Sequence, residues 1–245
     1  MLIVPQNSLD ARLIAENLAR IRTRIRCAAQ ESGQSVDRIT VIGASKGQSA
    51  AVIAMAHAAG LRDFGESYLQ DALPKMSALS QPAPAPTAGE PIIWHFIGAL
   101  QANKTRAVAE NFSWVHTVDR LRIGRRLSEQ RPYHAPPLNV CVQVHIGGEA
   151  SKGGVEPDAL RQLLRDLEAL PRLKLRGLMC LPPPEVTGAR QRHWLHQLRA
   201  LFESVNADGA GLDTLSMGMS ADLEAAVHEG ATQLRIGTDL FGPRA

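Results

Sequence analysis

Short apolar segments alternate with helical segments along almost the whole chain, and this alternation restricts the fold more than any other feature. Eight segments have the continuous apolar character of buried strands and are bounded by turn residues. They span residues 39–45, 61–66, 92–98, 114–118, 138–146, 173–180, 213–217 and 233–237. Strands that alternate with helices form parallel β–α units, so the pattern predicts a parallel sheet covered by helices.

The segments between these strands have the spacing of amphipathic helices. They span residues 49–59, 67–79, 103–111, 120–130, 157–169, 190–206 and 220–229. A further helix begins near residues 8–10 and ends near Gly33, ahead of the first strand. We therefore expect an α/β fold in which residues 1–245 form a single TIM-like (β/α)8 barrel with an extra N-terminal helix. An open doubly wound sheet is the alternative, although no G-x-G-x-x-G fingerprint follows the first strand.

Residues 80–90 interrupt this rhythm. They read SQPAPAPTAGE, a run rich in Pro, Ala and small polar residues, which predicts a flexible insertion. Because the run lies between a helix and a strand, we expect it at the end of the barrel opposite the functional site.

The composition argues against several classes of protein. The 27 basic and 24 acidic side chains nearly balance at +3, so we expect no nucleic-acid partner, although the first helix is rich in arginine. No run of about 18 apolar residues predicts a membrane span, and the N-terminus lacks the pattern of a secretory signal. The three cysteines have no metal-ligand spacing, which indicates no metal site and a reducing, cytoplasmic compartment.

Lys46 directly follows the first predicted strand. Functional residues of a TIM barrel gather at the C-terminal ends of its strands, so this side chain is expected at the barrel mouth. Apolar surroundings favour the neutral, nucleophilic amine, which forms imines with aldehydes. The structural alternative is a lysine that reaches the rim or pairs with Glu66 or Asp119.

The loops after the seventh and eighth strands form a second candidate site. Residues 216–220 (SMGMS) and 237–238 (GT) supply small side chains, hydroxyls and backbone N–H groups. These loops commonly bind phosphate in this fold, although SMGMS alone is also typical of a turn with a helix cap. A phosphate site opposite a lysine amine is what pyridoxal 5′-phosphate (PLP) requires.

Arg235 lies at the end of the eighth predicted strand. A guanidinium donates hydrogen bonds but accepts none, so beside the pyridine nitrogen of PLP it would keep that nitrogen unprotonated. The ring would then be a weaker electron sink than one paired with a carboxylate. The structural alternative is a salt bridge inside the barrel.

Seven ordered blocks resemble the YggS/PROSC family of pyridoxal phosphate homeostasis proteins, which are barrel-only relatives of bacterial alanine racemase. The blocks are residues 45–46 (SK), 64–68 (FGESY), 94–104 (WHFIGALQANK), 148–154 (GEASKGG), 177–179 (GLM), 215–220 (LSMGMS) and 235–237 (RIG) with 241–242 (FG). They extend over most of the chain, and their order and spacing are specific although each block alone is weak.

The resemblance implies a PLP Schiff base on Lys46 and an arginine, Arg235, facing the pyridine nitrogen. It further implies a phosphate site formed by Ser216, Gly218, Ser220, Gly237 and Thr238. Three positions depart from the family pattern. Ser67 stands near the cofactor where the family usually has Asn, Gly47 follows the lysine where a larger residue is common, and residues 145–147 (HIG) differ as well.

Two functions remain open. The first is a PLP-binding protein of intracellular vitamin B6 homeostasis with no assigned catalytic residue, which holds PLP and hands it to apo PLP enzymes. The second is a PLP-dependent amino-acid racemase, which needs a second base on the opposite face of the substrate.

In alanine racemase, the resemblance implies, that base is a tyrosine from a second domain and a neighbouring subunit. The chain reaches Ala245 directly after its last barrel unit, so we expect a monomer without that domain. Neither Tyr68, in a predicted helix, nor Tyr133, in a Pro-flanked loop, is expected at the rim. His95 and His145 are the other candidates for a second base.

Overall fold

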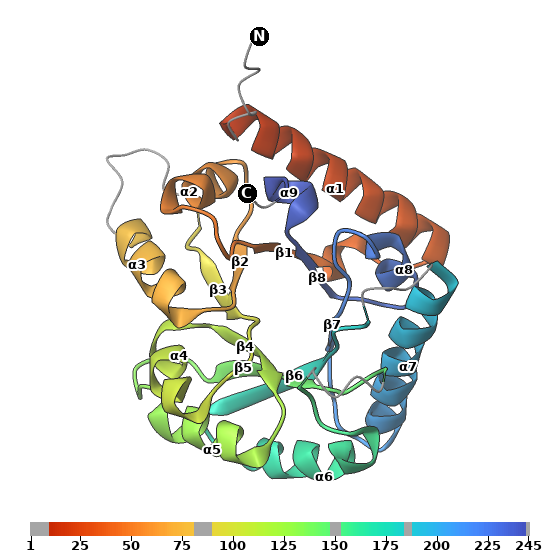
Figure 1. Ribbon diagram of the computed structural model, residues 1–245. Coiled ribbons are helices and arrows are strands. Elements are labelled where there is room, and N and C mark those ends of the chain that lie inside the picture. The colour runs from red at the N-terminus through yellow and green to blue at the C-terminus, as the bar shows by residue number, and fades with distance from the viewer. Residues whose placement is uncertain (1–9, 81–89, 148–152, 184–187, 244–245) are drawn as a thin grey trace.

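The computed structural model describes residues 10–80, 90–147, 153–183 and 188–243. Eight parallel strands form a closed barrel in chain order, and β8 pairs with β1 to complete it (Figure 1). The strands are β1 (Thr40–Ala44), β2 (Asp63–Glu66), β3 (Ile93–Phe96), β4 (Trp114–Val118), β5 (Leu138–Gln143), β6 (Leu173–Met179), β7 (Thr214–Ser216) and β8 (Gln233–Ile236). The predicted TIM-like barrel is therefore confirmed, and the open sheet is excluded.

Helices surround the barrel in Figure 1 and connect successive strands. They are α1 (Ala11–Ser32), α2 (Ala50–Ala58), α3 (Leu69–Leu79), α4 (Thr105–Asn111), α5 (Leu121–Gln130), α6 (Pro157–Glu168), α7 (Gly188–Ala207), α8 (Leu223–His228) and α9 (Thr238–Phe241). Two short 3-10 turns, η1 (Val36–Arg38) and η2 (Ala102–Lys104), precede β1 and α4. Within the described ranges, every helix is too short or too polar to cross a membrane.

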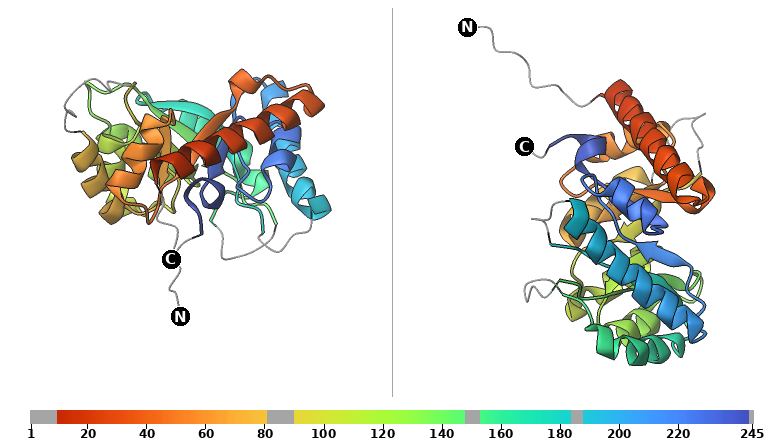
Figure 2. Two further views of the ribbon diagram at one scale, coloured as in Figure 1. Left: turned by 90° about the horizontal axis from the view of Figure 1, so that it is seen from above. Right: turned by 90° about the vertical axis from the view of Figure 1, so that its right-hand side faces the viewer.

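Local sequence signals account for the extra helix α1. The carboxylate of Asp10 accepts a hydrogen bond from the Leu13 amide at the start, and Gly33 ends the helix in the left-handed conformation at φ 70°. One face of α1 is buried and packs against α8 and α9, as the right-hand view of Figure 2 shows. The helix thus joins the beginning of the chain to the loops that follow β7 and β8.

The boundaries differ from the predictions in a few places. The strand expected over 138–146 ends at Gln143, and only Val144 continues it through a bridge to Val155. The short helix α9 at 238–241 was not predicted as a separate element. Most of the predicted insertion at 80–90 lies outside the described residues.

The barrel has an apolar outer layer and an interior that combines a small apolar cluster with polar side chains. Large side chains such as Phe64, Phe112 and Ile123 are fully buried in the main apolar core. Inside the barrel, by contrast, His95 stacks on Trp114 and contacts His116, and both histidines are fully buried. Because barrel interiors are usually filled by branched aliphatic residues, this polar layer requires a functional or positional explanation.

Candidate PLP-binding site

Lys46 lies in a tight turn at the C-terminal end of β1. The Gln48 amide donates to the Ser45 carbonyl, and Gly47 adopts a left-handed φ of 79° that this turn uses. Lys46 itself is half-buried. The sequence predicted its position correctly, and the turn explains the glycine that follows it.

A buried ionic group fixes the strand end beneath this turn. The carboxylate of Glu66 is fully buried, accepts from the Ser45 hydroxyl at 2.6 Å and pairs with the Lys75 amine at 2.8 Å. The Lys75 amine also donates to the Ser45 carbonyl at 3.1 Å. Since Glu66 pairs with Lys75, and Asp119 pairs with Arg120 at 2.8 Å, both carboxylates suggested as partners for Lys46 are engaged by other cations.

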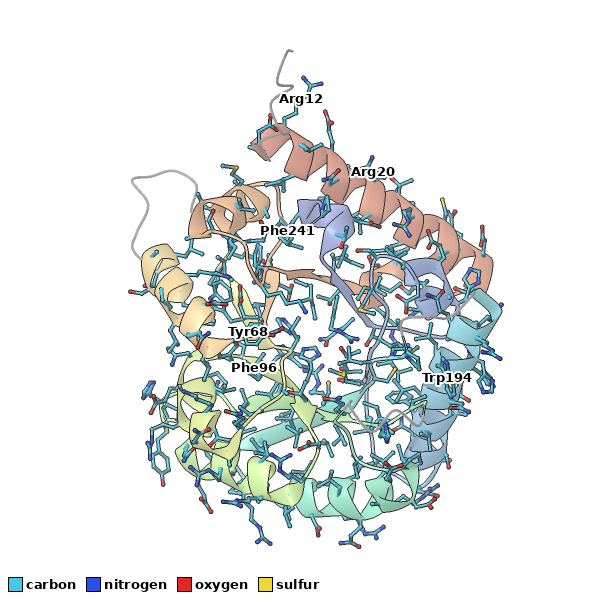
Figure 3. All side chains as sticks on the ribbon, in the orientation of Figure 1. Arg12, Arg20, Tyr68, Phe96, Trp194 and Phe241 are labelled. Carbon is cyan, nitrogen blue, oxygen red and sulfur yellow. The ribbon has the colours of Figure 1, made fainter. Side chains whose placement is uncertain are left out.

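A cavity of about 490 Å³ opens beside Lys46 at the ends of β1, β2 and β3. Ser67 lines it, as the resemblance implied, and so do Tyr68, Phe96 and Lys104. Figure 3 shows Tyr68 and Phe96 close together at the barrel mouth. The prediction for Tyr68 was wrong, because Tyr68 caps the N-terminus of α3 rather than lying within it, and its side chain is 59% exposed at the rim.

The loops after β7 and β8 present backbone donors. Within the described part of the chain, the amides of Gly218, Ser220, Gly237 and Thr238 have no hydrogen-bond acceptor. The Ser220 hydroxyl accepts from the Asp239 amide at 3.2 Å and so ties the two loops together. Unpaired amides on adjoining loops, at the beginning of a helix, provide the donors that a phosphate group needs.

Gly218 occupies a position that only glycine fits. Its φ is 92°, and a Cβ there would approach the Ala226 Cβ to 2.5 Å and the Leu234 Cδ2 to 2.7 Å. Its carbonyl accepts from the Arg235 amide at 3.0 Å, which holds the loop against β8. The close packing leaves the backbone of this loop, rather than a side chain, facing the barrel end.

We expect Gly218→Ala to weaken PLP binding at least about tenfold and to lower the free energy of unfolding by about 1–3 kcal/mol, because strain and overlap displace the loop. Gly209→Ala is the matched control: its φ is 93°, but nothing lies within 4 Å of the added Cβ. Titration with PLP and urea unfolding measure both quantities. Equal losses of PLP affinity in the two variants would contradict a role of this loop in phosphate binding.

Arg24 of α1 holds the two loops from outside the barrel. Its guanidinium pairs with Glu224 at 2.6 Å and with Asp239, and it donates to the Ser220 carbonyl at 3.2 Å. The ion pair lowers the pKa of Glu224, because the hydrogen bond from Arg24 favours the carboxylate. No local sequence feature indicated this role, since Arg24 is one of several arginines in the first helix.

Arg24→Met is expected to weaken PLP binding about fivefold, which corresponds to about 1 kcal/mol, while binding of pyridoxal without its phosphate stays unchanged. The physical reason is that Arg24 contacts only the loops after β7 and β8, the predicted phosphate site, which we call the phosphate loops. Arg12→Met is the control on the same helix, because Arg12 forms an exposed i,i+4 pair with Glu16. A similar loss of affinity for pyridoxal would show that Arg24 stabilises the whole barrel instead of the loops alone.

Arg235 lies inside the barrel and is only 4% exposed. It donates to the Ser216 hydroxyl at 2.7 Å and to the Cys180 carbonyl at 2.8 Å, and burial lowers its pKa. Among the described residues, no carboxylate forms an ion pair with it, which removes the salt-bridge alternative. The Ser216 hydroxyl therefore faces the barrel interior, and only the backbone of Ser216 adjoins the phosphate loop.

The structure thus brings the predicted residues together at one end of the barrel in two groups. Lys46 and Ser67 line the cavity, and the loops carrying Gly218, Ser220 and Gly237 lie beyond Arg235. Part of the family-like block at 148–154 lies outside the described residues. Among the residues that the structure describes, no cluster of three or more His, Cys, Asp or Glu side chains is arranged to hold a metal ion.

Comparison with known proteins decides the family. Residues 16–245 match the model of the alanine racemase N-terminal domain. The pyridoxal phosphate homeostasis protein of Pseudomonas aeruginosa is 54% identical over 231 residues, which cover 94% of this chain and 96% of that protein. This chain belongs to the family of pyridoxal phosphate homeostasis proteins.

Two further proteins support this family assignment. The homologue from Escherichia coli strain K12, which carries the same name, is 45% identical over 94% of this chain and 97% of its own length. PipY of Synechococcus elongatus PCC7942, solved with PLP bound, is 35% identical with a TM-score of 0.80 and covers 94% of this chain and 100% of PipY. The resemblance derived from the seven sequence blocks is therefore confirmed.

Proposed function

We propose that this chain binds PLP as a Schiff base on Lys46 and serves intracellular PLP homeostasis with little or no catalytic turnover. The observation that carries the proposal is the position of Lys46, in a cavity at the same barrel end as loops with unpaired amides. The relatives from P. aeruginosa and E. coli are named pyridoxal phosphate homeostasis proteins, and PipY has been solved with PLP bound.

The residues present fit this cofactor. The amine of Lys46 would condense with the aldehyde of PLP, so that a C=N bond forms and one water molecule leaves. The loops that carry Ser216, Gly218, Ser220, Gly237 and Thr238 would donate hydrogen bonds to its phosphate. Arg235 would meet the pyridine nitrogen as a donor, and Ser67 would lie near the cofactor, since it lines the same cavity as Lys46.

PLP bound in this way is a weak catalyst. Because the guanidinium of Arg235 accepts no proton, the ring nitrogen stays unprotonated and stabilises a carbanion poorly. His95, one candidate for a second base, lies fully buried inside the barrel and cannot reach a substrate at the rim. His145 hydrogen-bonds to Glu156 at 2.6 Å. These features favour holding PLP over turning over amino acids.

The position of Tyr68 supports the alternative function of an amino-acid racemase, because Tyr68 lines the same cavity as Lys46. A phenolate there could take a proton from one face while Lys46 acts on the other. Formation of D-alanine from L-alanine by the purified protein with PLP, lost in Tyr68→Phe, would establish this second function. We expect no D-alanine above the rate without protein.

Borohydride reduction followed by peptide mapping tests the proposal. Reduction converts the C=N bond to a stable amine and leaves the PLP group on the lysine that carried it. Lys46 and Lys104 both line the cavity, so the map distinguishes the predicted amine from a neighbour. We expect the label on Lys46; a label on Lys104, or none at all, contradicts the proposal.

We further propose that the protein is a single barrel domain and a monomer of the cytoplasm. It would transfer PLP to apo PLP enzymes, which explains why it has a cofactor site without an assigned catalytic residue. Light scattering of the purified protein measures the oligomeric state. Activation of an apo PLP enzyme by the loaded protein, faster than by the same amount of free PLP, would demonstrate transfer.

A further inference from the structure

Five polar side chains form one hydrogen-bonded chain across the barrel interior. Asp63 Oδ1 lies 2.9 Å from His95 Nε2, and His95 Nδ1 lies 2.9 Å from His116 Nε2. His116 Nδ1 then lies 2.7 Å from Ser216 Oγ, which accepts from Arg235 Nη1 at 2.7 Å. The chain joins β2, β3, β4, β7 and β8, and no other residue interrupts it.

Burial separates this hydrogen-bonded chain of side chains from solvent everywhere except at one end. His95, His116 and Ser216 are fully buried, and Arg235 is 4% exposed. The side chain of Asp63, the first residue of β2, is 17% exposed. Asp63 therefore lies toward the N-terminal end of the barrel, and the chain leads from there to the arginine near the opposite end.

The two terminal groups determine the direction of every bond. A guanidinium only donates and an ionised carboxylate only accepts. The Ser216 hydroxyl therefore accepts a hydrogen bond from Arg235 and donates its own hydrogen bond to His116 Nδ1. His116 must then carry its proton on Nε2 and donate it to His95, which donates from its own Nε2 to Asp63. The opposite direction requires an additional proton within the chain.

Burial favours the neutral form of both histidines, which this arrangement requires. Burial lowers the pKa of His95, although the hydrogen bond to Asp63 acts against this shift. Burial also lowers the pKa of His116 well below its usual value, and the nearby His95 and Arg235 act in the same sense. Two neutral rings with defined tautomers connect a buried cation to a carboxylate.

The chain also accounts for the buried charge of Arg235. A buried guanidinium without a nearby carboxylate is costly, and in the described residues its direct partners are the Ser216 hydroxyl and the Cys180 carbonyl. Asp222 contributes only an electrostatic attraction without contact. Hydrogen bonds in series polarise one another, so the carboxylate of Asp63 stabilises the cation from a distance.

We propose that Asp63, His95 and His116 are positioning residues, which through Ser216 fix the guanidinium of Arg235 where it meets the ring of the bound cofactor. The inference rests on the proposed function, in which Arg235 faces the pyridine nitrogen of PLP. It assigns a role in cofactor binding to a carboxylate toward the other end of the barrel.

The direction of the chain is testable in the protein without PLP. Nitrogen-15 NMR of labelled histidine distinguishes a protonated from an unprotonated ring nitrogen. We expect both His95 and His116 to be protonated at Nε2 and unprotonated at Nδ1 near pH 7.5. A proton on Nδ1 of either ring would overturn the proposal, whether or not any variant folds.

Asp63→Asn tests the connection to the cofactor. The side chain keeps its shape, but it loses the charge and its amide can donate to His95 as well as accept. We expect the tautomer at His116, two bonds further along, to become mixed and the visible band of bound PLP to shift. PLP affinity is expected to fall about fivefold, as for the loss of one distant charge.

Glu31→Gln is the matched control, since Glu31 forms an exposed pair with His228 at 3.2 Å that has no link to Arg235. It should leave the spectrum and the affinity unchanged. If Asp63→Asn binds PLP as wild type does, with an unchanged band, Asp63 has no positioning role. If wild type forms no PLP adduct at all, the proposed function fails instead, and the NMR result still decides the direction of the chain.

Discussion

Lys46→Ala mixed with PLP is expected to show no visible absorption of a protein-bound Schiff base and no label after borohydride reduction. The proposed covalent bond requires this amine, which lines the cavity and follows β1 in the turn at residues 45–48. The phosphate loops remain intact in the variant, so we expect residual, non-covalent binding of PLP that inorganic phosphate displaces. Absorbance spectra and mass spectrometry of the reduced protein measure the two effects.

Lys104→Ala is the control for this experiment. Lys104 lines the same cavity but lies at the end of the turn η2, where its side chain is exposed. We expect this variant to retain the band and the reducible label at the wild-type level. If Lys46→Ala keeps the visible absorption band and Lys104→Ala loses it, Lys104 carries the cofactor and our proposal for Lys46 is wrong.

The second large effect is a loss of stability in mild acid. His95 and His116 have pKa values lowered by burial, so the folded protein keeps both rings neutral at a pH where the unfolded chain is protonated. Stability is therefore complete above about pH 6.5, the usual histidine pKa, and falls as the pH drops below it. Each ring contributes up to about 1.4 kcal/mol per pH unit in this range.

Urea unfolding at pH 7.5 and 5.5 measures this effect. Each ring that stays neutral in the folded protein should reduce the free energy of unfolding by up to about 1.4 kcal/mol between these conditions. His116→Gln should be less stable than wild type at both pH values but lose less stability between them, because one titrating ring is removed. His134→Gln, at an exposed loop histidine, should keep the wild-type difference. An unchanged difference in His116→Gln would contradict a neutral, buried His116.

Much of the fold follows from the sequence because the signal is repeated. The apolar runs at 39–45 and 114–118, with helical spacing between the strands, predict parallel β–α units. All eight predicted strands are present, and Lys46 lies at a strand end as expected. The helix α3 begins two residues later than predicted and α9 was not predicted, because an N-cap such as Tyr68 and a four-residue helix leave little periodicity.

The site was predicted less completely than the fold, because several roles depend on contacts between distant residues. Nothing in the local sequence distinguishes Arg24 from its neighbours on α1, yet it alone meets Glu224 and Asp239. The hydroxyl of Ser216 was expected among the phosphate ligands, but strand alternation turns it inward to His116. Such assignments require knowledge of which strands lie opposite each other.

The packing of α1 against α8 and α9 has a consequence for biosynthesis. Ribosomes release the first helix long before residues 223–241, so α1, whose buried face includes Ile14 and Leu18, can pack against α2 early but lacks its contacts with α8 and α9 for most of translation. Arg24 likewise meets Glu224 and Asp239 only when the last strand has emerged. The loops after β7 and β8 therefore receive their support from Arg24 only when synthesis is nearly complete, and a chain truncated before residue 223 lacks both partners of that arginine.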